Sequence, residues 1–500
     1  MSRVGAGALL GFLASVALAI SAQALGAYGF GTTVADSTFG IRWLGRALGL
    51  AGLAGLLGAW LLVREASARA CWGMALLWAV PLLVAPPVGS RDLFAYAEQG
   101  WLVLTGHDPY TTAMGSVGGP YADCVDVWWR GTTTVYPPLA LELQRVLVGL
   151  AGENTWLGVR LLRLPALVGV GLMGLLAPRV AQLLGHSSRA ATWALLLNPV
   201  VILHGIGGGH HDLLAAGLGV AAVWMALRRR WGWLAGAAVV GLAMAIKQPL
   251  GLVVVALAAI GGRTAALHGG SPTQGQPAAG GQVSDARQPG QADDALEPTE
   301  RAVGTVSVHA ADRARWVGVV WRTVVAAVVA AAVFALVTAL SGLGWGWLTG
   351  SGSPYSVVTV APSALLADAA ARVGFATFTG ALRVLGPLGI AVAAVLIAWR
   401  AWRDLLDRPV RWLGHALLLV ALGAPALQVW YALWAVGHLA ADGVPLRHER
   451  AVLAATVVAL ALCWTVEMVG VPPLWGAPGS VAAAMAAAAA GARRAYEAPE

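Results

Sequence analysis

The chain has 500 residues, of which 58% are hydrophobic and only 11% are charged, and its formal net charge is +8 at pH 7. Its mean hydropathy is +0.72. This composition excludes an ordinary soluble domain. The basic residues gather in short turns between apolar runs, which excludes a nucleic-acid-binding surface. We expect an all-α polytopic membrane protein, in which the positive charges report topology.

Apolar runs recur along the chain, and several of them are long enough to cross a bilayer. In the first half they cover residues 5–30, 44–63, 70–88, 156–177, 190–206, 213–227, 233–246 and 250–260. The first of them is too long for a cleaved signal peptide, so we expect a retained helix. In the second half they cover residues 316–340, 381–399, 412–422, 427–436, 451–469 and, weakly, 480–491. At ~20 residues for each span, we predict a bundle of about 12–14 transmembrane helices.

Arginine-rich turns set the expected topology. The clearest is Arg228-Arg229-Arg230, and clusters of this kind mark cytoplasmic turns. The N-terminus is then inside, and the loops over residues 89–155 and 342–378 are outside. A segment rich in Gly, Pro, Gln and Ser is expected to be a disordered cytoplasmic linker between two membrane halves. The expected units are an N-terminal half over residues 1–262, the linker 263–315, a C-terminal half over 316–491 and a tail 492–500.

The first outer loop begins with a carboxylate, Asp92, just past the end of an apolar run. Tyr96 and Gln99 follow at i+4 and i+7, so a helix here puts the three side chains on one face. We expect this helix to lie along the membrane and to present Asp92 as a catalytic or ligand-binding group; the alternative is that Asp92 caps the helix. The face expected to meet lipid carries Leu93, Ala97 and Leu104.

Two further features of the outer side combine turns with polar or aromatic groups. Asp108, Tyr110 and Tyr136 lie in turn-forming stretches of the first loop, where the tyrosines are expected either to contact a sugar or to form part of an interfacial aromatic belt. The run Gly207-Gly208-Gly209-His210-His211-Asp212 opens a helix, and a glycine-rich helix start favours an anion such as a phosphate. Two alternatives stay open there: His-His-Asp holds a divalent cation such as Mg²⁺ or Mn²⁺, or Asp212 caps the helix.

Several motifs occur in a fixed order along the chain. They are Ser90-Arg91-Asp92, His107-Asp108-Pro109-Tyr110, Tyr136-Pro137-Pro138, Asn198-Pro199, Gly209-His210-His211-Asp212, Ile246-Lys247-Gln248-Pro249, Gly344-Trp345-Gly346-Trp347 and Gln428-Val429-Trp430-Tyr431. Together they resemble the actinobacterial polyprenol-phosphate-mannose-dependent α-1,6-mannopyranosyltransferases over most of the chain. The sequence departs from that pattern at His211, where the family commonly has Asn, and at Val429, where it commonly has Pro.

The resemblance implies a GT-C-like inverting glycosyltransferase of the plasma membrane with its active site on the extracytoplasmic face. Its partners would be a polyprenyl-phosphate-mannose donor, a lipid-linked mannan acceptor of the lipomannan and lipoarabinomannan core, and membrane lipids. By resemblance, Asp92 is the expected general base. The expected substrate-binding residues are Arg91, Tyr96, Asp108, Tyr110, Tyr136, His210, His211, Asp212, Lys247, Gln428, Trp430 and Tyr431.

The chemistry of such a reaction asks for few protein groups. A β-linked polyprenyl phosphate is a good leaving group, so a base for the acceptor hydroxyl and a fixed cation for the phosphate are sufficient. Lys247 is the only lysine in the chain and interrupts two short apolar runs. We expect it at the tip of a broken membrane hairpin, either beside the donor phosphate or merely reaching the interface.

Two other classes of protein stay open at this stage. A transporter or flippase of a polyprenyl-linked sugar would also have interrupted helices and charges within the membrane. Such proteins usually contain an internal repeat, and none is evident between the halves of this sequence. A noncatalytic lipid-binding scaffold would not need Asp92. Transfer of labelled mannose from the polyprenyl-phosphate donor to a mannosyl acceptor separates the three.

Overall fold

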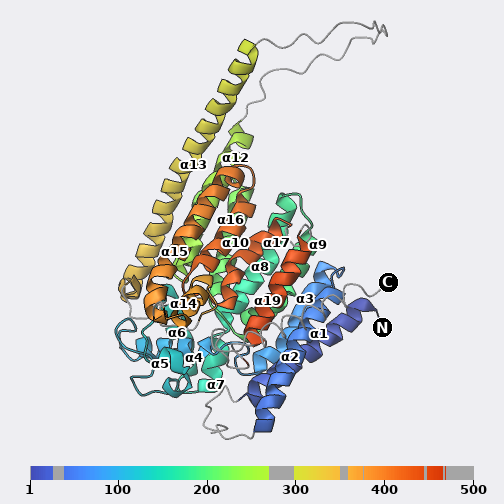
Figure 1. Ribbon diagram of the computed structural model, residues 1–500, viewed down its shortest axis with the longest axis vertical. Coiled ribbons are helices and arrows are strands. Elements are labelled where there is room, and N and C mark those ends of the chain that lie inside the picture. Colours follow the sequence, from blue (N-terminus) through green and yellow to red (C-terminus); the bar gives the residue numbers. More distant parts are fainter. Residues whose placement is uncertain are drawn as a thin grey trace.

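The computed structural model describes residues 2–25, 39–269, 298–348, 359–374, 377–443, 448–464 and 468. Within these residues every regular element is a helix (Figure 1). The predicted all-α membrane fold is therefore confirmed. The N-terminal group is α1 (Arg3–Ala24), α2 (Phe39–Leu62) and α3 (Ala68–Val84). Gly11 of α1 leaves room for the indole of Trp78 in α3, whose Nε1 donates to the carbonyl of Ala8 at 3.0 Å.

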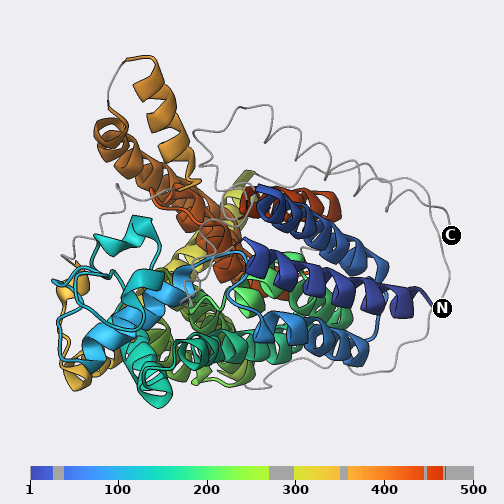
Figure 2. The same cartoon turned by 90° about the horizontal axis from the view of Figure 1, so that it is seen from below.

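The first predicted outer loop, residues 89–155, is folded into helices, and we call it the outer layer after that prediction. It forms a layer at one end of the molecule, drawn at the bottom of Figure 1. The layer contains α4 (Asp92–Leu104), η2 (Ala122–Cys124), α5 (Val127–Arg130), α6 (Pro138–Ala151) and α7 (Thr155–Leu161). Seen from that end, the outer layer and helices α1–α3 occupy different sides of the molecule (Figure 2).

The central bundle follows. Its elements are α8 (Leu164–Leu183), α9 (Ser188–Leu196), η3 (Val201–Gly207), α10 (Asp212–Arg228), α11 (Gly232–Met244), η4 (Gln248–Leu252) and α12 (Val253–Gly269). Helix α9 and the π-helical η3 are bent by 60° at a break that contains Asn198-Pro199, because proline cannot continue the hydrogen-bonding of the preceding turn. Helices α8 and α10 cross closely, since a Cβ on Gly169 would lie 2.2 Å from the carbonyl carbon of Leu213.

The C-terminal group packs onto this bundle. Its elements are α13 (Pro298–Ser341), η5 (Gly346–Leu348), α14 (Pro362–Arg372), α15 (Phe378–Arg400), η6 (Ala401–Leu405), α16 (Pro409–Gly423), η7 (Val429–Ala432), α17 (Leu433–Ala441) and α19 (Glu449–Cys463). Helix α13 runs beside α11 and α12, and α17 contacts α8, α9 and α10. The C-terminal group therefore completes the bundle and does not form a separate body.

Five helices in the described residues are long and apolar enough to cross a membrane. They are Arg3–Ala24, Trp43–Leu62, Thr155–Leu183, Asp312–Ser341 and Thr379–Leu405. The bent pair of α9 and η3 makes a sixth if it is one span, and five apolar helices of 10–17 residues are shorter. The chain is thus a polytopic membrane protein, while the total of about 12–14 spans stays a prediction that rests on ~20 residues for each crossing.

The predicted linker needs correction at both ends. We expected disorder over residues 263–315, but α12 continues to Gly269 and α13 begins at Pro298. Pro298 is the first residue of α13, a position that proline favours, and no proline follows it up to Ser341. Residues 270–297, the weak apolar run 480–491 and the tail 492–500 lie outside the described residues. The second outer loop, predicted over 342–378, contains η5 and α14.

Candidate active site

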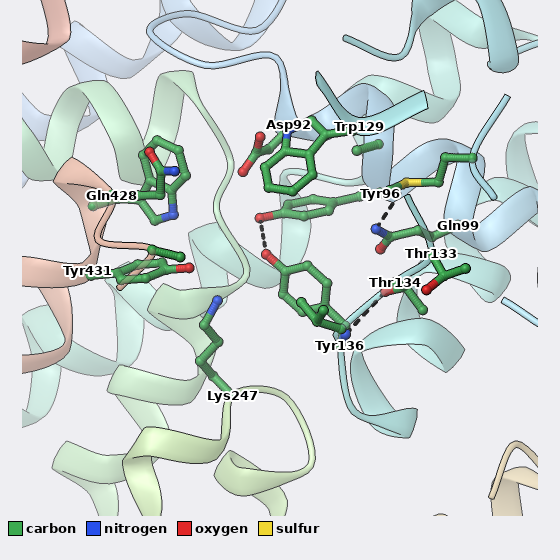
Figure 3. A pocket seen from close by; sticks show the side chains of 15 residues that line it. Asp92, Tyr96, Gln99, Trp129, Thr133, Thr134, Tyr136, Lys247, Gln428 and Tyr431 are labelled. Atoms are coloured by element: carbon green, nitrogen blue, oxygen red, sulfur yellow. Dashed lines mark hydrogen bonds between the residues drawn. The ribbon is translucent and has the colours of Figure 1, made fainter. Parts of the chain in front are cut away.

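One pocket lies where the outer layer meets the broken helices of the bundle (Figure 3). Helix α4 and the chain between α4 and α6 supply one part of its wall. The break between α11 and η4 and the break between α16 and η7 supply the other part. The lining residues are Asp92, Ala95, Tyr96, Gln99, Met114, Trp129, Thr133, Thr134, Val135, Tyr136, Lys247, Ala426, Gln428, Trp430 and Tyr431. Seven of the thirteen predicted site residues are among them: Asp92, Tyr96, Tyr136, Lys247, Gln428, Trp430 and Tyr431.

Asp92 reaches the pocket from the first residue of α4. Its backbone N–H donates to the Oγ of Ser90 at 3.2 Å, and Arg91 occupies the capping position. The alternative that Asp92 caps the helix is therefore wrong, and Asp92 lines the pocket. The conformation before the helix depends on Gly89, whose φ of 75° suits glycine.

Helix α4 was predicted to lie along the membrane with its apolar face against lipid, and that part of the prediction is wrong. Leu93 and Ala97 are fully buried, and of the three residues expected to face lipid only Leu104 is exposed. The reason is α6, which packs directly on α4: a Cβ on Gly100 would lie 2.6 Å from the backbone of Gln144. The sequence pattern identified the polar face of α4 correctly, but the opposite face is covered by protein.

The surroundings of Asp92 weaken its acidity. Burial is the largest effect and raises the pKa of Asp92 to about 7, while the charge of Lys247 opposes the rise. Asp212 and Asp126 add to the rise, and a hydrogen bond from Trp129 opposes it. A carboxyl group that ionises near neutral pH can both accept a proton and release it again, as a general base requires.

A chain of polar contacts runs beside Asp92. The hydroxyls of Tyr96 and Tyr136 are 3.0 Å apart, and Tyr96 Oη lies 3.4 Å from His210 Nδ1. The same Nδ1 is 3.8 Å from Asp92 Oδ2. The ring of His210 stacks on Trp430 with 3.9 Å between centroids. These contacts hold Tyr96 and His210 in place beside the carboxyl group of Asp92.

Lys247 enters the pocket from the break between α11 and η4, as the broken-hairpin prediction expected. Its Nζ lies 3.2 Å from Asp212 Oδ1. The rings of Tyr136 and Tyr431 flank it, with 4.8 and 4.7 Å from Nζ to the ring centroids. Figure 3 shows the amine directed at the space between these two rings. Cation–π contacts and a buried carboxylate thus fix an ammonium group at the pocket wall.

Asp212 lies behind Lys247 and is fully buried. Helix α10 begins at Asp212, with His211 at the capping position, so the capping alternative is wrong here too. Instead, Asp212 Oδ1 accepts a hydrogen bond of 2.8 Å from Nε1 of Trp434 in α17. Asp212 does not line the pocket, and its contacts are those of a residue that positions Lys247.

Other predicted site residues lie outside the pocket wall. Arg91 donates to the carbonyl of Cys124 at 3.3 Å and pairs with Asp126, which ties α4 to the following loop. Asp108 accepts from the N–H of Tyr110 at 2.9 Å and closes a turn. The hydroxyl of Tyr110 donates to the carbonyl of Tyr136 at 3.1 Å. These residues shape the outer layer, and none of them lines the pocket.

The two histidines of the Gly-His-His-Asp motif diverge. His211 Nε2 lies 3.1 Å from the carbonyl oxygen of Leu162, whereas His210 lies against Trp430. In the part of the chain that the structure describes, no three His, Cys, Asp or Glu side chains are grouped as metal ligands. A need for Mg²⁺ or Mn²⁺ thus stays a prediction without a ligand set. Gly209, with φ of 62°, makes the turn that leads into these two residues.

Sequence reasoning missed part of the pocket. Gln99 was placed on the Asp92 face but not named as a site residue, and Trp129, Thr133 and Thr134 were not singled out. Trp129 comes from the short helix α5, and Thr133 and Thr134 come from the irregular chain that follows it, whose path no periodic pattern reveals. Trp434, the hydrogen-bond partner of Asp212, was read as part of an apolar run.

The fold and the pocket define a polytopic membrane protein with a buried carboxyl group and a fixed amine at one end of its helical bundle. A family model described as alpha-(1->6)-mannopyranosyltransferase, N-terminal domain, matches residues 8–263, and one described as MptB C-terminal domain matches residues 357–493. The chain belongs to the actinobacterial alpha-(1->6)-mannopyranosyltransferase family, a family of membrane glycosyltransferases.

Individual relatives agree with this membership. The chain is 29% identical to alpha-(1->6)-mannopyranosyltransferase A of Mycobacterium tuberculosis, over 83% of this chain and 72% of the relative. It is 30% identical to a probable alpha-(1->6)-mannopyranosyltransferase of Mycolicibacterium smegmatis, over 87% of this chain and 79% of the relative. A second M. tuberculosis protein, alpha-(1->6)-mannopyranosyltransferase Rv1459c, is 31% identical over 76% of this chain and 67% of its own length. No solved structure matches the chain significantly.

Proposed function

We propose that this chain is an inverting mannosyltransferase that moves mannose from a polyprenyl-phosphate-mannose donor to a lipid-linked mannan acceptor. The reaction would take place at the extracytoplasmic face of the plasma membrane, in the synthesis of the lipomannan and lipoarabinomannan core. Family membership supports the reaction class, since the relatives are named for α-(1→6) mannosyl transfer. The observation that carries the proposal is that Asp92 and Lys247 line the same pocket.

The proposed step is a single displacement. The oxygen of the acceptor 6-hydroxyl forms a bond to C1 of the donor mannose while the bond from C1 to the phosphate oxygen breaks. The bonding pair leaves with the polyprenyl phosphate, and the hydroxyl proton passes to the carboxylate of Asp92. Attack from the side opposite the phosphate converts a β-linked donor into an α-linked product. The ammonium of Lys247 offsets the negative charge that builds on the departing phosphate.

The arrangement of Lys247 supports this division of roles. Asp212 holds the amine from behind, aromatic rings flank it, and Lys247 lines the pocket. A phosphate that enters the pocket would meet an ammonium that is already oriented, which lowers the cost of organising the charge during the reaction. Lysine offers a compact point charge here, whereas the planar fork of arginine needs a wider site.

The test is the isosteric variant Asp92→Asn in purified, detergent-solubilised protein. Transfer of labelled mannose from polyprenyl-phosphate-mannose to a mannosyl acceptor should fall by about 100-fold or more, as loss of a positioned base generally does. Donor binding should persist because the amide keeps the shape of the side chain. Transfer close to the wild-type rate would rule out a base at this position.

A matched control is Glu142→Gln. Glu142 pairs with Arg145 on α6, outside the pocket, and such partly exposed pairs contribute only about 0–1 kcal/mol. This variant should transfer mannose at the wild-type rate. Wild-type protein that moves the labelled donor across a vesicle membrane without transferring its sugar would instead identify a flippase.

A further inference from the structure

The two ends of the pocket differ in chemistry (Figure 3). At one end lie the amine of Lys247 and the aromatic ring of Tyr431, with Gln428 and Trp430 nearby, all from breaks between helices of the bundle. The other end lies in the outer layer, and its polar lining is uncharged: Gln99, Trp129, Thr133 and Thr134. In Figure 3 Tyr96 and Tyr136 lie between Lys247 and the side chains of Gln99, Thr133 and Thr134, while Trp129 is drawn next to Asp92.

Gln99 is the most informative residue of the uncharged end. Its side chain is 97% buried, since only 3% of its surface is exposed. Among the described residues its Oε1 has no hydrogen-bond partner, and its Nε2 donates only to the sulfur of Met114, at 3.4 Å. Sulfur is a weak acceptor, and a buried amide without good partners is costly to the folded protein. An incoming ligand with hydroxyl groups would supply both a donor and an acceptor.

The neighbours of Gln99 have the same character. The Oγ1 of Thr134 accepts from the N–H of Tyr136 at 3.1 Å, and its own hydroxyl proton can be donated to a ligand. Trp129 lines the pocket and also donates a hydrogen bond to Asp92. An amide, hydroxyls and an aromatic ring are suited to a neutral, hydroxyl-rich ligand, and these four side chains carry no charge of their own.

We propose that the end formed by Gln99, Trp129, Thr133 and Thr134 binds the terminal hexose of the acceptor, and that the Lys247 end binds the phosphate of the donor. This inference rests on the proposed function. The donor carries a lipid chain, so its phosphate belongs beside the helices of the bundle. The acceptor ends in a hydrophilic sugar, which approaches from the outer layer. Trp129 touches Asp92, so a hexose bound there has a hydroxyl within reach of the base.

The experiment compares two buried glutamines. Gln99→Leu removes the amide and keeps the approximate volume of the side chain. Gln144→Leu makes the same change on α6, at a fully buried side chain that does not line the pocket.

Initial rates are measured with an alkyl α-mannoside as acceptor and polyprenyl-phosphate-mannose as donor, each varied while the other is saturating. KM for the acceptor should rise about 10-fold in Gln99→Leu, the loss expected for a hydrogen bond or two. The KM of Gln99→Leu for the donor should stay within about 2-fold of wild type, because Gln99 lies away from the donor end. Gln144→Leu should keep both its donor KM and its acceptor KM within about 2-fold of wild type, because Gln144 does not line the pocket.

Each outcome separates the two proposals. Wild-type protein that transfers no mannose overturns the proposed function. Wild-type protein that transfers mannose, together with an unchanged acceptor KM in Gln99→Leu, overturns the acceptor subsite alone. A raised donor KM with an unchanged acceptor KM would also overturn it, since Gln99 would then belong to the donor end. If Gln99→Leu does not fold, Gln99→Asn is used, which keeps the amide but shortens it and should raise the acceptor KM by a smaller factor.

Discussion

At the scale of single residues, the pair of Lys247 and Asp212 shows how the pocket is charged. Their side chains are 10% and 0% exposed, and the two charges lie 3.2 Å apart. Removing both from water is costly, so the pair persists because further groups support it. Trp434 donates to Asp212, and the ring faces of Tyr136 and Tyr431 contact the ammonium. The result is a cation held at a fixed place for a ligand.

The pH dependence of transfer tests the coupling between Lys247 and Asp92. The base must be ionised, and burial raises the pKa of Asp92 to about 7, so the single-turnover rate should rise with pH and level off above that value. The charge of Lys247 lowers this pKa. Lys247→Ala removes that effect, so the midpoint of the profile should move to higher pH, and donor affinity should fall.

Lys247→Arg is the control for this profile. It keeps a positive charge, so the midpoint should stay near the wild-type value, while donor affinity recovers only in part because a guanidinium is wider than an ammonium. A midpoint that stays fixed or moves to lower pH in Lys247→Ala would contradict the assignment of Asp92 as the titrating base.

Some residue roles could be predicted and others could not. Asp92, Tyr96 and Gln99 share a helical face by simple spacing, and that face lines the pocket. Asp108 was expected to bind substrate but closes a local turn, because a sequence does not distinguish a ligand-binding carboxylate from one that bonds its own backbone two residues on. Trp434 could not be recognised, since its partner Asp212 is 222 residues away along the chain.

At the scale of elements, the pocket depends on interrupted helices. The break at Lys247-Gln248-Pro249 was predicted, and a second break lies at Gly423-Ala424-Pro425: α11 ends at Met244 and α16 at Gly423. Residues at these two breaks, Lys247 and Gln428 among them, line the pocket. Proline makes such breaks recognisable because it removes a backbone donor.

The close crossing of α8 and α10 places the start of α10, and therefore Asp212. A Cβ on Gly169 would lie 2.2 Å from the carbonyl carbon of Leu213, the residue after Asp212. We expect Gly169→Val to push the helices apart, with a cost of about 1–3 kcal/mol or more for overpacking. The melting temperature in detergent should fall, and mannose transfer should fall with it.

Gly171→Val is the matched control on the same helix, because nothing lies within 4 Å of a Cβ built there. Both variants pay the same small helix-propensity difference between glycine and valine, so any difference in melting temperature reports packing against α10. Equal melting temperatures would show that the crossing tolerates a side chain.

The burial of α4 could not be predicted from its own sequence. Its apolar face was expected to meet lipid, but α6 covers it, and α6 itself was hidden in what read as a long polar loop. Amphipathic spacing shows that a face is apolar without showing whether lipid or protein contacts it. Only the tertiary pairing of α4 with α6 settles that point.

At the scale of the whole molecule, the pocket joins the two membrane halves. Asp92 and Lys247 lie in the region matched by the N-terminal family model, while Gln428, Trp430 and Tyr431 lie in the region matched by the C-terminal one. Trp434 links the halves again by its hydrogen bond to Asp212. Neither half alone therefore contains a complete site.

The pocket end and the arginine-rich end of α10 lie far apart. Helix α10 has 17 residues from Asp212 to Arg228, which is about 25 Å at the rise of an α-helix. We predict that the pocket end faces outward. Single cysteines at Glu153 and Arg229, both exposed, would be placed in a background from which the three buried cysteines have been removed. In intact cells an impermeant maleimide should label Glu153→Cys and spare Arg229→Cys.

Permeabilised cells provide the control for this experiment, since both positions should then react. Labelling of Arg229→Cys but not Glu153→Cys in intact cells would reverse the orientation, and the donor would then have to be supplied from the cytoplasmic leaflet.

The lysine in the pocket has a consequence for chemical labelling. Of the 32 lysine and arginine residues, 31 are arginine, so Lys247 provides the only side-chain amine in the chain. Reagents that acylate or alkylate amines react with the neutral fraction of a lysine amine, whereas arginine stays protonated and its guanidinium group is left largely untouched at moderate pH. A tag attached to a side-chain amine of this protein therefore marks one atom at the wall of its pocket. The rate at which Lys247 is tagged then reports whether a ligand occupies the pocket, and the wild-type sequence can be used without an engineered probe.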